Sequence, residues 1–414
     1  MNVEVDHNFN LREVTAPASK SYAQRAIMAA SLGSGTSTIR NIGSSDDVQN
    51  ILNVAKQLGA EIKKTTDGVT IAARMNPVNT ELNCGESGLG VRLTTPIAGT
   101  FGEHFKISGT GSLLKRPMEQ FETFLPQLGV EVHTIHGKLP LTIDGRLQGG
   151  EIHLDGSLSS QFLSGLMMAL PLAEKDSVIH IQNLVSKPYV KMTLEIMRLF
   201  GIDVTNNYDL SKIEVPGRQS YQPCDYSVEG DWSGASFWAV YGAIKGNFQL
   251  KGLNPRSNQA DIAILKAIVA AGGSFEWINE TVIIHKTPLQ SFNFDATNCP
   301  DLFPPLVVLA AATNGTSLIG GVSRLKHKES DRAAVLKKEF NKLGLSVEIE
   351  GDIMRIESTG ELSSGTIESH NDHRIAMAGA IAAVLTPGIN KIAQAEAVNK
   401  SYPEFWDTLK GSNS

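Results

Sequence analysis

Cysteines and long apolar runs are scarce in this sequence of 414 residues. The three cysteines, Cys84, Cys224 and Cys299, are too few and too far apart for a disulfide framework or a CxxC metal or redox motif. No uninterrupted apolar stretch reaches the roughly 18 residues of a membrane span. The opening MNVEVDHNFN has no basic region followed by an apolar one, so we expect no signal peptide. These absences predict a cytoplasmic protein without membrane contact.

An excess of positive charge is also missing. Lys plus Arg number 37 against 43 Asp plus Glu, a formal net charge of -6, which argues against a general nucleic-acid or membrane-surface binder. Any anion site must therefore be a local cluster of cations. With 41% hydrophobic residues, the chain has enough apolar material for a large core, and its length predicts two or three domains. We expect a monomer.

An internal repeat organises the chain. An amphipathic helical pattern that ends in a glycine, followed by a strand-like run, recurs five times. The marker glycines are Gly59, Gly129, Gly201, Gly272 and Gly344, separated by 70, 72, 71 and 72 residues. Glycine is the residue that a helix prefers just past its C-terminus. The helices before these glycines carry a charged face, which predicts that they lie outside.

A second marker of the repeat is a Ser or Asp that opens a helix apolar nearly all round. These residues are Ser21, Ser87, Ser159, Ser233, Asp301 and Asp372. Ser and Asp are N-cap types, and a helix apolar on all sides must be buried. Six copies of about 70 residues match the chain length. They predict an α/β protein with two lobes of three units, buried helices inside and short sheets outside.

Cations recur at the starts of the predicted helices, where free N–H groups already attract anions. They are Lys20, Arg25, Arg92, Arg116, Lys328, Arg332, Arg374 and Lys400. Arginine on an otherwise apolar helix is costly without an anion partner, so Arg25, Arg92 and Arg374 carry the strongest argument. Taken singly, these motifs also fit ion pairs or helix caps. Together they predict two phosphorylated or carboxylated substrates.

The motifs, taken in order, resemble those of the enolpyruvyl transferase family. The matching segments are SKSYAQRA, ESGLGVRL, KRPMEQ, SLSSQFLSGL, SKPY, CPDLFPPL, KESDR, NDHRIAMA and NKSYPEF. The resemblance implies a two-lobed inside-out α/β barrel with six βαβαββ repeats, three per lobe. The first lobe would be residues 19–229 and the second residues 1–18 plus 230–414.

The resemblance also implies a reaction of the shikimate pathway, in aromatic amino acid biosynthesis. The enolpyruvyl group of phosphoenolpyruvate moves to the 5-hydroxyl of shikimate 3-phosphate, phosphate is released, and no metal or organic cofactor is implied. The family pattern places shikimate 3-phosphate against Lys20, Ser21, Arg25, Ser159, Ser160, Gln161, Ser186, Tyr189, Asp301 and Lys328. It places phosphoenolpyruvate against Lys20, Gly88, Arg116, Gln161, Arg332, Arg374 and Lys400.

Three residues would carry the chemistry. The reaction needs a base for the 5-hydroxyl proton, an acid for the methylene carbon and a stabiliser of developing charge. By the resemblance, Asp301 is the base, Glu329 donates to and accepts from the methylene carbon, and Lys20 stabilises charge. Lys20 is also a candidate acid, and the sequence alone does not assign which of the three moves which proton.

One motif departs from the family pattern Asn-x-Gly-Thr. Here it reads Glu86-Ser87-Gly88-Leu89, so an amide becomes a carboxylate and a hydroxyl is lost. A carboxylate beside phosphoenolpyruvate would repel it. We therefore expect Glu86 to pair with Lys20 or Arg116, and the affinity for phosphoenolpyruvate and its mimic glyphosate to change.

Three alternatives stay open. A sister family transfers the same group to a UDP-sugar and uses a loop cysteine, although none of the three cysteines follows a loop signature. A repeated clamp around nucleic acid would explain buried cations but not the carboxylates among them. A paralogue that binds its ligands without turning them over is the interpretation that Glu86 and Leu89 favour.

Overall fold

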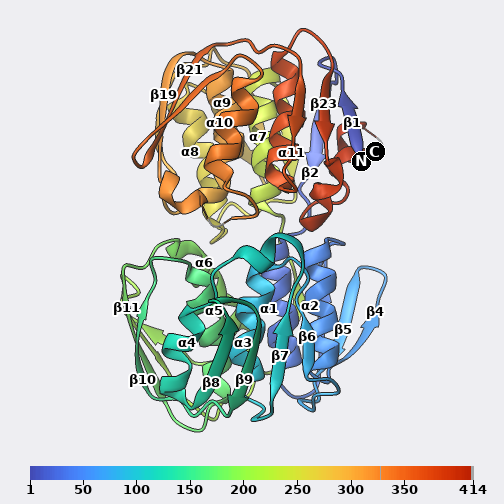
Figure 1. Cartoon of the computed structure of the whole chain (residues 1–414). Coiled ribbons are helices and arrows are strands. Elements are labelled where there is room, and N and C mark those ends of the chain that lie inside the picture. Colours follow the sequence, from blue (N-terminus) through green and yellow to red (C-terminus); the bar gives the residue numbers. More distant parts are fainter. Residues whose placement is uncertain (327, 412–414) are drawn as a thin grey trace. The chain divides into compact units, whose positions relative to one another are not determined.

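The computed structural model describes residues 1–326 and 328–411. The chain folds into two compact units, one formed by Met1–Pro17 and Glu229–Ser414 and the other by Ala18–Val228. We call them the split unit and the continuous unit. Each is a mixture of helices and small sheets (Figure 1).

The continuous unit holds three four-stranded sheets. Their strand orders are β14(Asp225–Ser227)-β3(Thr36–Arg40)-β5(Gly68–Ala72)-β4(Glu61–Lys64), β6(Glu81–Asn83)-β7(Phe105–Ser108)-β9(Lys138–Gly145)-β8(Val130–Ile135), and β10(Glu151–Asp155)-β11(Ser177–Gln182)-β13(Lys212–Val215)-β12(Thr205–Asn206). Its helices are α1(Lys20–Ser31), α2(Asp46–Gln57), α3(Gly88–Ala98), α4(Gln120–Phe124), α5(Ser160–Ala169) and α6(Lys187–Leu199).

The split unit repeats this plan. Its sheets are β2(Glu13–Thr15)-β15(Phe248–Lys251)-β17(Thr281–His285)-β16(Ser274–Ile278), β18(Asn293–Asp295)-β19(Asn314–Gly320)-β21(Ile353–Thr359)-β20(Ser346–Glu350), and the three-stranded β22(Thr366–Glu368)-β23(Asn390–Ala393)-β1(Asn2–Val5). Its helices are α7(Trp232–Lys245), α8(Ile264–Ala270), α9(Phe303–Ala311), α10(Arg332–Asn341), α11(His373–Ala382) and α12(Phe405–Leu409).

The sheets share one pairing pattern. The first strand of each runs parallel to the second, and the remaining neighbours are antiparallel. In each unit the first sheet takes its edge strand from a distant segment: β14 closes the sheet of β3, and β2 closes the sheet of β15. The described residues therefore form a mixed α/β fold with six small sheets.

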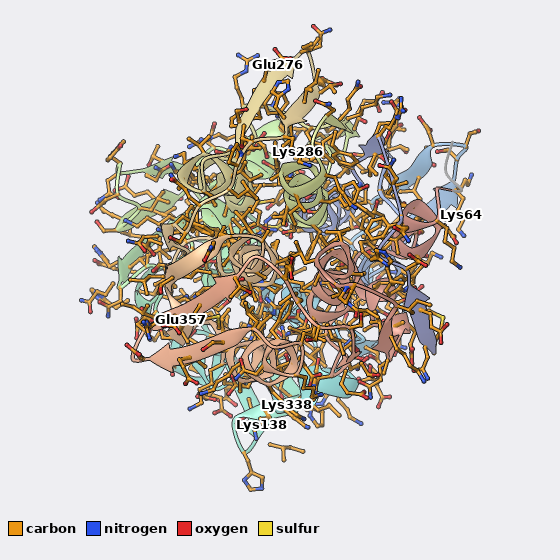
Figure 2. All side chains as sticks on the ribbon, turned by 90° about the horizontal axis from the view of Figure 1, so that it is seen from above. Lys64, Lys138, Glu276, Lys286, Lys338 and Glu357 are labelled. Atoms are coloured by element: carbon orange, nitrogen blue, oxygen red, sulfur yellow. The ribbon has the colours of Figure 1, made fainter. Side chains whose placement is uncertain are left out.

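The two predicted kinds of helix are present. Helices α7, α9 and α11 pack against one another, as α3 does against α1 and α5, and their residues are almost all buried. Helices α2 and α6 keep an exposed face. Charged side chains such as Glu276 on β16 and Glu357 on β21 point outward (Figure 2). No helix in residues 1–326 and 328–411 is long and apolar enough to span a bilayer.

The predicted N-caps are half right. Ser87, Ser159 and Asp372 cap α3, α5 and α11, and each accepts a hydrogen bond from the backbone of its helix. Ser21 and Ser233 are wrong, because α1 and α7 begin earlier and place them inside the first turn. In both cases a second cap-type residue stands two positions upstream, and the helix uses it. The residues that cap α1 and α7 are Ser19 and Asp231.

The fifth predicted cap, Asp301, is also wrong. It lies in the short 3-10 turn η5(Pro300–Leu302), and α9 follows with Leu302 before its first residue. The carboxylate of Asp301 is therefore available for ion pairs rather than for a cap.

The marker glycines are confirmed. Their φ angles are +103° for Gly59, +87° for Gly129, +77° for Gly201, +81° for Gly272 and +85° for Gly344. This left-handed conformation ends a helix at little cost only when Cβ is absent. The second outer helix is shorter than predicted, because Pro126 ends α4 and starts the 3-10 turn η2(Pro126–Leu128).

Candidate active site

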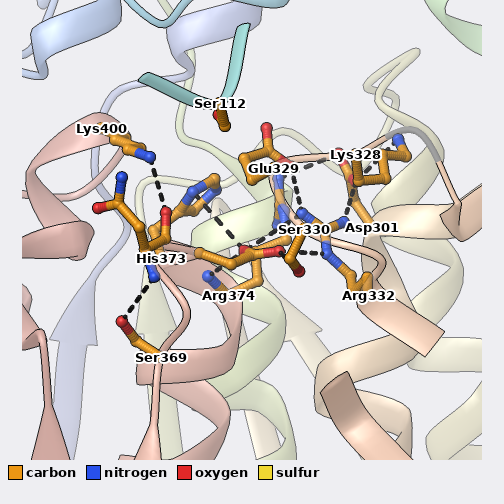
Figure 3. Close-up of polar contacts among 12 residues, drawn as sticks. Ser112, Asp301, Lys328, Glu329, Ser330, Arg332, Ser369, His373, Arg374 and Lys400 are labelled. Carbon is orange, nitrogen blue, oxygen red and sulfur yellow. Dashed lines mark hydrogen bonds and ion pairs between the residues drawn. The ribbon is translucent and has the colours of Figure 1, made fainter. Parts of the chain in front are cut away.

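Arg332 is the centre of the polar cluster in the split unit (Figure 3). It is the first residue of α10 and is fully buried. Its Nη1 lies 2.8 Å from Asp301 Oδ1, its Nη2 2.5 Å from Glu329 Oε2, and its Nε 3.0 Å from Asp372 Oδ2. Burial would lower the pKa of this guanidinium, but the three carboxylates raise it instead. Arg332 therefore keeps its charge and neutralises its neighbours.

Asp301 forms ion pairs with three cations that lie on different segments of the split unit. Besides Arg332 it accepts from Lys328 Nζ at 3.1 Å and from Arg374 Nη2 at 3.1 Å. Burial opposes its ionisation, yet Arg374, Lys328 and Arg332 together hold its pKa well below the usual range. Asp301 is therefore a carboxylate, and a poor base for as long as all three cations stay on it.

Arg374 and Lys400 stand on neighbouring segments of the same unit. Arg374 lies in the first turn of the buried helix α11, and its backbone N–H donates to Asp372 Oδ1 at 3.0 Å. Its Nη1 is buried and has no hydrogen-bond partner among the described residues. Lys400 ends the 3-10 turn η8(Ala395–Lys400), and its Nζ donates to the Asn371 carbonyl at 2.7 Å. Arg374 thus has an N–H donor left for a ligand.

In the continuous unit, Arg25 is held by neutral atoms. It is 1% exposed on α1. Nε donates to Thr193 Oγ1 at 2.8 Å, Nη1 to the Ser21 carbonyl at 2.8 Å, and Nη2 to the Tyr189 carbonyl at 3.2 Å and more weakly to Ser164 Oγ at 3.5 Å. Burial lowers the pKa of Arg25 to about 10. The guanidinium is fixed in place, and within the described part of the chain its charge has no ion pair.

Arg92 on α3 repeats this situation. Nη1 donates to the Gly88 carbonyl and to Gln161 Oε1, both at 3.1 Å, and Nη2 to the Pro117 carbonyl at 3.2 Å. Its guanidinium lies 4.7 Å from the centre of the Phe162 ring. Burial, and then the like charge of Arg116, lower the pKa of Arg92 to about 9. The like charge of Arg116 beside the buried Arg92 favours the binding of an anion close to them.

Gly88 lies against the Arg116 guanidinium. A Cβ built on Gly88 would lie 2.2 Å from Arg116 Nη1, so any side chain there would displace the guanidinium.

Lys20, the first residue of α1, forms a 2.8 Å ion pair with Asp47. Glu86 Oε2 accepts from the Ser112 backbone N–H at 2.9 Å and from its hydroxyl at 3.0 Å. The pairing of Glu86 with Lys20 or Arg116 stays a prediction.

The predicted residues fall into two groups by unit. Arg25 donates hydrogen bonds to the Ser21 and Tyr189 carbonyls, which brings these three predicted residues together. Arg92 likewise donates to the Gly88 carbonyl and to Gln161 Oε1. Ser159 caps α5, whose first residue is the buried Ser160. Ser186 precedes α6 with φ +56°. The split unit connects Asp301, Lys328, Glu329, Arg332 and Arg374 by ion pairs, and Lys400 adjoins them through Asn371.

Sequence reasoning missed several partners. Asp372 was predicted as a cap but also pairs with Arg332, and Asp47 pairs with Lys20. A further carboxylate, Asp261, is buried and accepts from Ser233 Oγ. Burial, and then the charge of Asp301, raise the pKa of Asp261 to about 7. Only the NDHR motif, which contains Asp372, offered a signal for any of these.

Buried arginines and lysines with carboxylates among them, on a repeated α/β fold, define an enzyme that binds small anions. The family model of EPSP synthase (3-phosphoshikimate 1-carboxyvinyltransferase) matches residues 11–409. The chain belongs to this family.

Relatives and solved structures agree with this. A 3-phosphoshikimate 1-carboxyvinyltransferase from Clostridium acetobutylicum is 38% identical over 405 residues, 96% of this chain and 94% of the relative. One from Clostridium novyi is 36% identical over 406 residues, 95% of this chain and 93% of the relative. A solved structure of EPSP synthase from Acinetobacter baumannii is similar with a TM-score of 0.80 at 25% identity, covering 99% of this chain and 98% of that one.

Proposed function

We propose that this chain transfers the enolpyruvyl group of phosphoenolpyruvate to the 5-hydroxyl of shikimate 3-phosphate and releases phosphate. Family membership supports the reaction. The observation that carries it in this chain is the pair Arg25 and Arg92, two buried guanidinium groups whose described hydrogen bonds all go to uncharged atoms. Such charges are costly until an anion binds them.

The proposal includes the finer architecture. The two units are then the two lobes of an inside-out α/β barrel with six βαβαββ repeats, and the lobes comprise residues 19–229 and 1–18 plus 230–414. The repeated parallel-then-antiparallel pairing of the sheets supports this description.

The residues divide between the two substrates. Shikimate 3-phosphate is held by Lys20, Ser21, Arg25, Ser159, Ser160, Gln161, Ser186, Tyr189, Asp301 and Lys328. Phosphoenolpyruvate is held by Lys20, Gly88, Arg116, Gln161, Arg332, Arg374 and Lys400. The Nη1 of Arg374, which has no partner among the described residues, supports its place in the second set, because a buried N–H donor aimed at no protein atom suits a carboxylate or phosphate oxygen.

The reaction then proceeds by addition and elimination. Asp301 takes the proton of the 5-hydroxyl, whose oxygen bonds to the central carbon of phosphoenolpyruvate while Glu329 delivers a proton to the methylene carbon. Glu329 then takes a proton back from the resulting methyl group, the carbon–oxygen bond to phosphate breaks, and the vinyl double bond re-forms. Lys20 stabilises the charge that develops on the way.

Substrate binding prepares both carboxylates for these steps. Three cations now hold the pKa of Asp301 low, and Arg332 lies against Glu329. Anionic substrates that attract Arg332, Arg374 and Lys328 weaken those ion pairs. The proton affinity of Asp301 and Glu329 then rises when substrate is present, which suits a base and an acid respectively.

The cysteine mechanism of the sister family has little support. Burial raises the pKa of Cys84 to about 12 and also raises the pKa of Cys299. Burial, and then Asp225, raise the pKa of Cys224. None of the three thiols is prepared to act as a thiolate at neutral pH.

Phosphate release from phosphoenolpyruvate tests the proposal. Shikimate 3-phosphate and UDP-N-acetylglucosamine are offered separately in chelator-treated buffer. Release with the former, abolished in Glu329→Ala and Lys20→Ala, is expected. Release only with the sugar nucleotide would assign the chain to the sister activity. Silence with both, while shikimate 3-phosphate still binds, would mark a protein that binds without turnover.

A further inference from the structure

A strained turn connects β22 to the buried helix α11. His370 and Asn371 have φ angles of +51° and +58°. Two consecutive residues with a Cβ in the left-handed region are unfavourable, because Cβ approaches the following carbonyl oxygen. Such a turn persists only where its surroundings hold it in place.

Glu339 on α10 holds this turn from one side. It is fully buried, 0% exposed. Its Oε1 lies 2.9 Å from His370 Nε2, and its Oε2 accepts from the Glu368 backbone N–H at 3.0 Å and from Lys342 Nζ at 2.5 Å. One carboxylate thus fixes the last residue of β22 and the first strained residue after it.

The rest of the turn is fixed by hydrogen bonds around Ser369 and Gln394. Ser369 Oγ donates to the Gln394 carbonyl at 2.9 Å. The Asn371 backbone N–H donates to Ser369 Oγ at 3.1 Å and to Gln394 Oε1 at 3.2 Å. Gln394 immediately precedes η8, the turn that ends at Lys400.

The strained turn and the residue after it bind two cations of the proposed phosphoenolpyruvate site and start the helix that carries a third (Figure 3). The Asn371 carbonyl accepts from Lys400 Nζ at 2.7 Å. The next residue, Asp372, caps the helix that carries Arg374 and accepts from Arg332 Nε at 3.0 Å. A shift of this backbone would therefore move the acceptors of Lys400 and Arg332 and the first turn of the helix that carries Arg374.

We propose that Glu339 is a positioning residue for phosphoenolpyruvate, acting through His370 and the strained turn on Lys400, Arg332 and Arg374. Glu339 touches none of these cations itself in the described contacts. This inference rests on the proposed function. It predicts a defect confined to one of the two substrates.

The main test is Glu339→Gln, which keeps the size of the side chain and removes its charge. At saturating shikimate 3-phosphate, kcat/KM for phosphoenolpyruvate is expected to fall roughly tenfold to a hundredfold, since small displacements of positioning groups cost this much. The fall should come mainly from a higher KM for phosphoenolpyruvate. KM for shikimate 3-phosphate should stay within about twofold of wild type. Among its proposed contacts Asp301 pairs with the displaced cations, whereas Arg25 and its neighbours in the continuous unit are untouched.

Two further variants separate positioning from folding. His370→Ala removes the imidazole that links Glu339 to the strained turn, and should reproduce the selective rise in KM for phosphoenolpyruvate. His370→Gln offers an amide N–H to Glu339 and should recover most of the loss. The matched control is Glu348→Gln, which removes an exposed carboxylate paired with Lys337 at 2.6 Å in the same unit and should leave both KM values unchanged.

The outcomes are distinguishable. Wild-type protein without turnover would contradict the proposed function. Wild-type turnover with an unchanged KM for phosphoenolpyruvate in Glu339→Gln, or with both KM values raised equally, would overturn the positioning role alone. If Glu339→Gln does not fold, the test rests on His370→Ala and His370→Gln. Equal KM values for phosphoenolpyruvate in these two variants would then overturn the positioning role.

Discussion

Both units bury arginine side chains that helices carry, and they surround these arginines differently. In the split unit, carboxylates raise the pKa of Arg332 and Arg374 despite burial. In the continuous unit, burial lowers the pKa of Arg25 to about 10 and of Arg92 to about 9. The split unit thus neutralises its buried charge internally. In the continuous unit, the described hydrogen bonds of Arg25 and Arg92 go to uncharged atoms, so the same residue type faces carboxylates in one unit and neutral groups in the other.

The comparison also bears on why the two carboxylates that we propose as catalytic belong to one unit. Arg332 lies against both Asp301 and Glu329, and together with Arg374 and Lys328 it holds the pKa of Asp301 low despite burial. An acid placed beside Arg25 would neutralise the charge that we propose binds the phosphate of shikimate 3-phosphate. We therefore expect mutations in the two clusters to separate stability from binding.

The largest effect is expected for Arg332→Met. Removing this fully buried cation leaves Asp301, Glu329 and Asp372 close together, and breaking a buried ion pair costs about 3–5 kcal/mol. The free energy of unfolding, measured by urea titration, should fall by that amount. Arg355→Met, which breaks an exposed pair with Glu357, should change it by less than about 1 kcal/mol. Equal losses in the two variants would remove the distinction between the units.

Arg25→Met should instead affect binding. A charge-assisted hydrogen bond to a phosphate contributes about 1.5–3 kcal/mol, so the Kd for shikimate 3-phosphate, measured by calorimetry, should rise roughly tenfold to a hundredfold. The stability of the ligand-free protein should fall much less than in Arg332→Met. Arg40→Met removes an exposed arginine of the same unit and should leave the Kd unchanged. A loss of stability in Arg25→Met as large as in Arg332→Met would contradict the comparison.

A pH titration tests the charge balance of the split unit more finely. The pKa of Asp261 is raised to about 7 in the folded protein, against about 3.9 in an unfolded chain. The folded state therefore binds the proton more tightly, and the stability that this contributes is full below about pH 4 and lost as the pH rises through about 7.

Asp261→Asn should remove this dependence. The difference in unfolding free energy between the variant and wild type, measured by urea titration at several pH values, should shift in favour of the variant as the pH rises from about 4 to about 7. A constant difference across this range would show that Asp261 is ionised throughout.

The smallest effect is expected for Glu86→Asn in the continuous unit. Asparagine is one methylene shorter than glutamate, so the bonds from Ser112 are weakened, and stability should fall by about 1 kcal/mol or less. Removal of one negative charge near Gly88 should lower KM for phosphoenolpyruvate and strengthen inhibition by glyphosate by about fivefold, the equivalent of about 1 kcal/mol. Unchanged constants for both ligands would show that the charge of Glu86 does not reach the site.

Local rules account for what the sequence could predict. A left-handed φ at Gly59 or Gly344 follows from glycine alone, and the apolar surface of α1 or α11 predicts burial directly. The cap choice failed at Ser21, because the neighbouring Ser19 is equally suitable. The premature end of the second outer helix was readable from Pro126.

Partners far apart in the sequence could not be predicted. The ion pair of Lys20 with Asp47 joins two helices, and the pair of Glu339 with His370 joins positions 31 residues apart. Neither Asp47 nor Glu339 lies in a motif that singles it out. The cations of the site were visible because they recur with the repeat, whereas their counter-charges follow no period and depend on packing.

Each unit takes an edge strand from a distant segment of the chain, and this sets the order in which the two units can be completed during synthesis. The continuous unit has all its described strands once β14 has been made, at Ser227. The strands β1 and β2 of the split unit are made first but pair with β23 and β15, and β23 ends only at Ala393. On the ribosome, the first two strands therefore wait for their partners while the continuous unit is completed, and the last sheet cannot close until almost the whole chain has emerged.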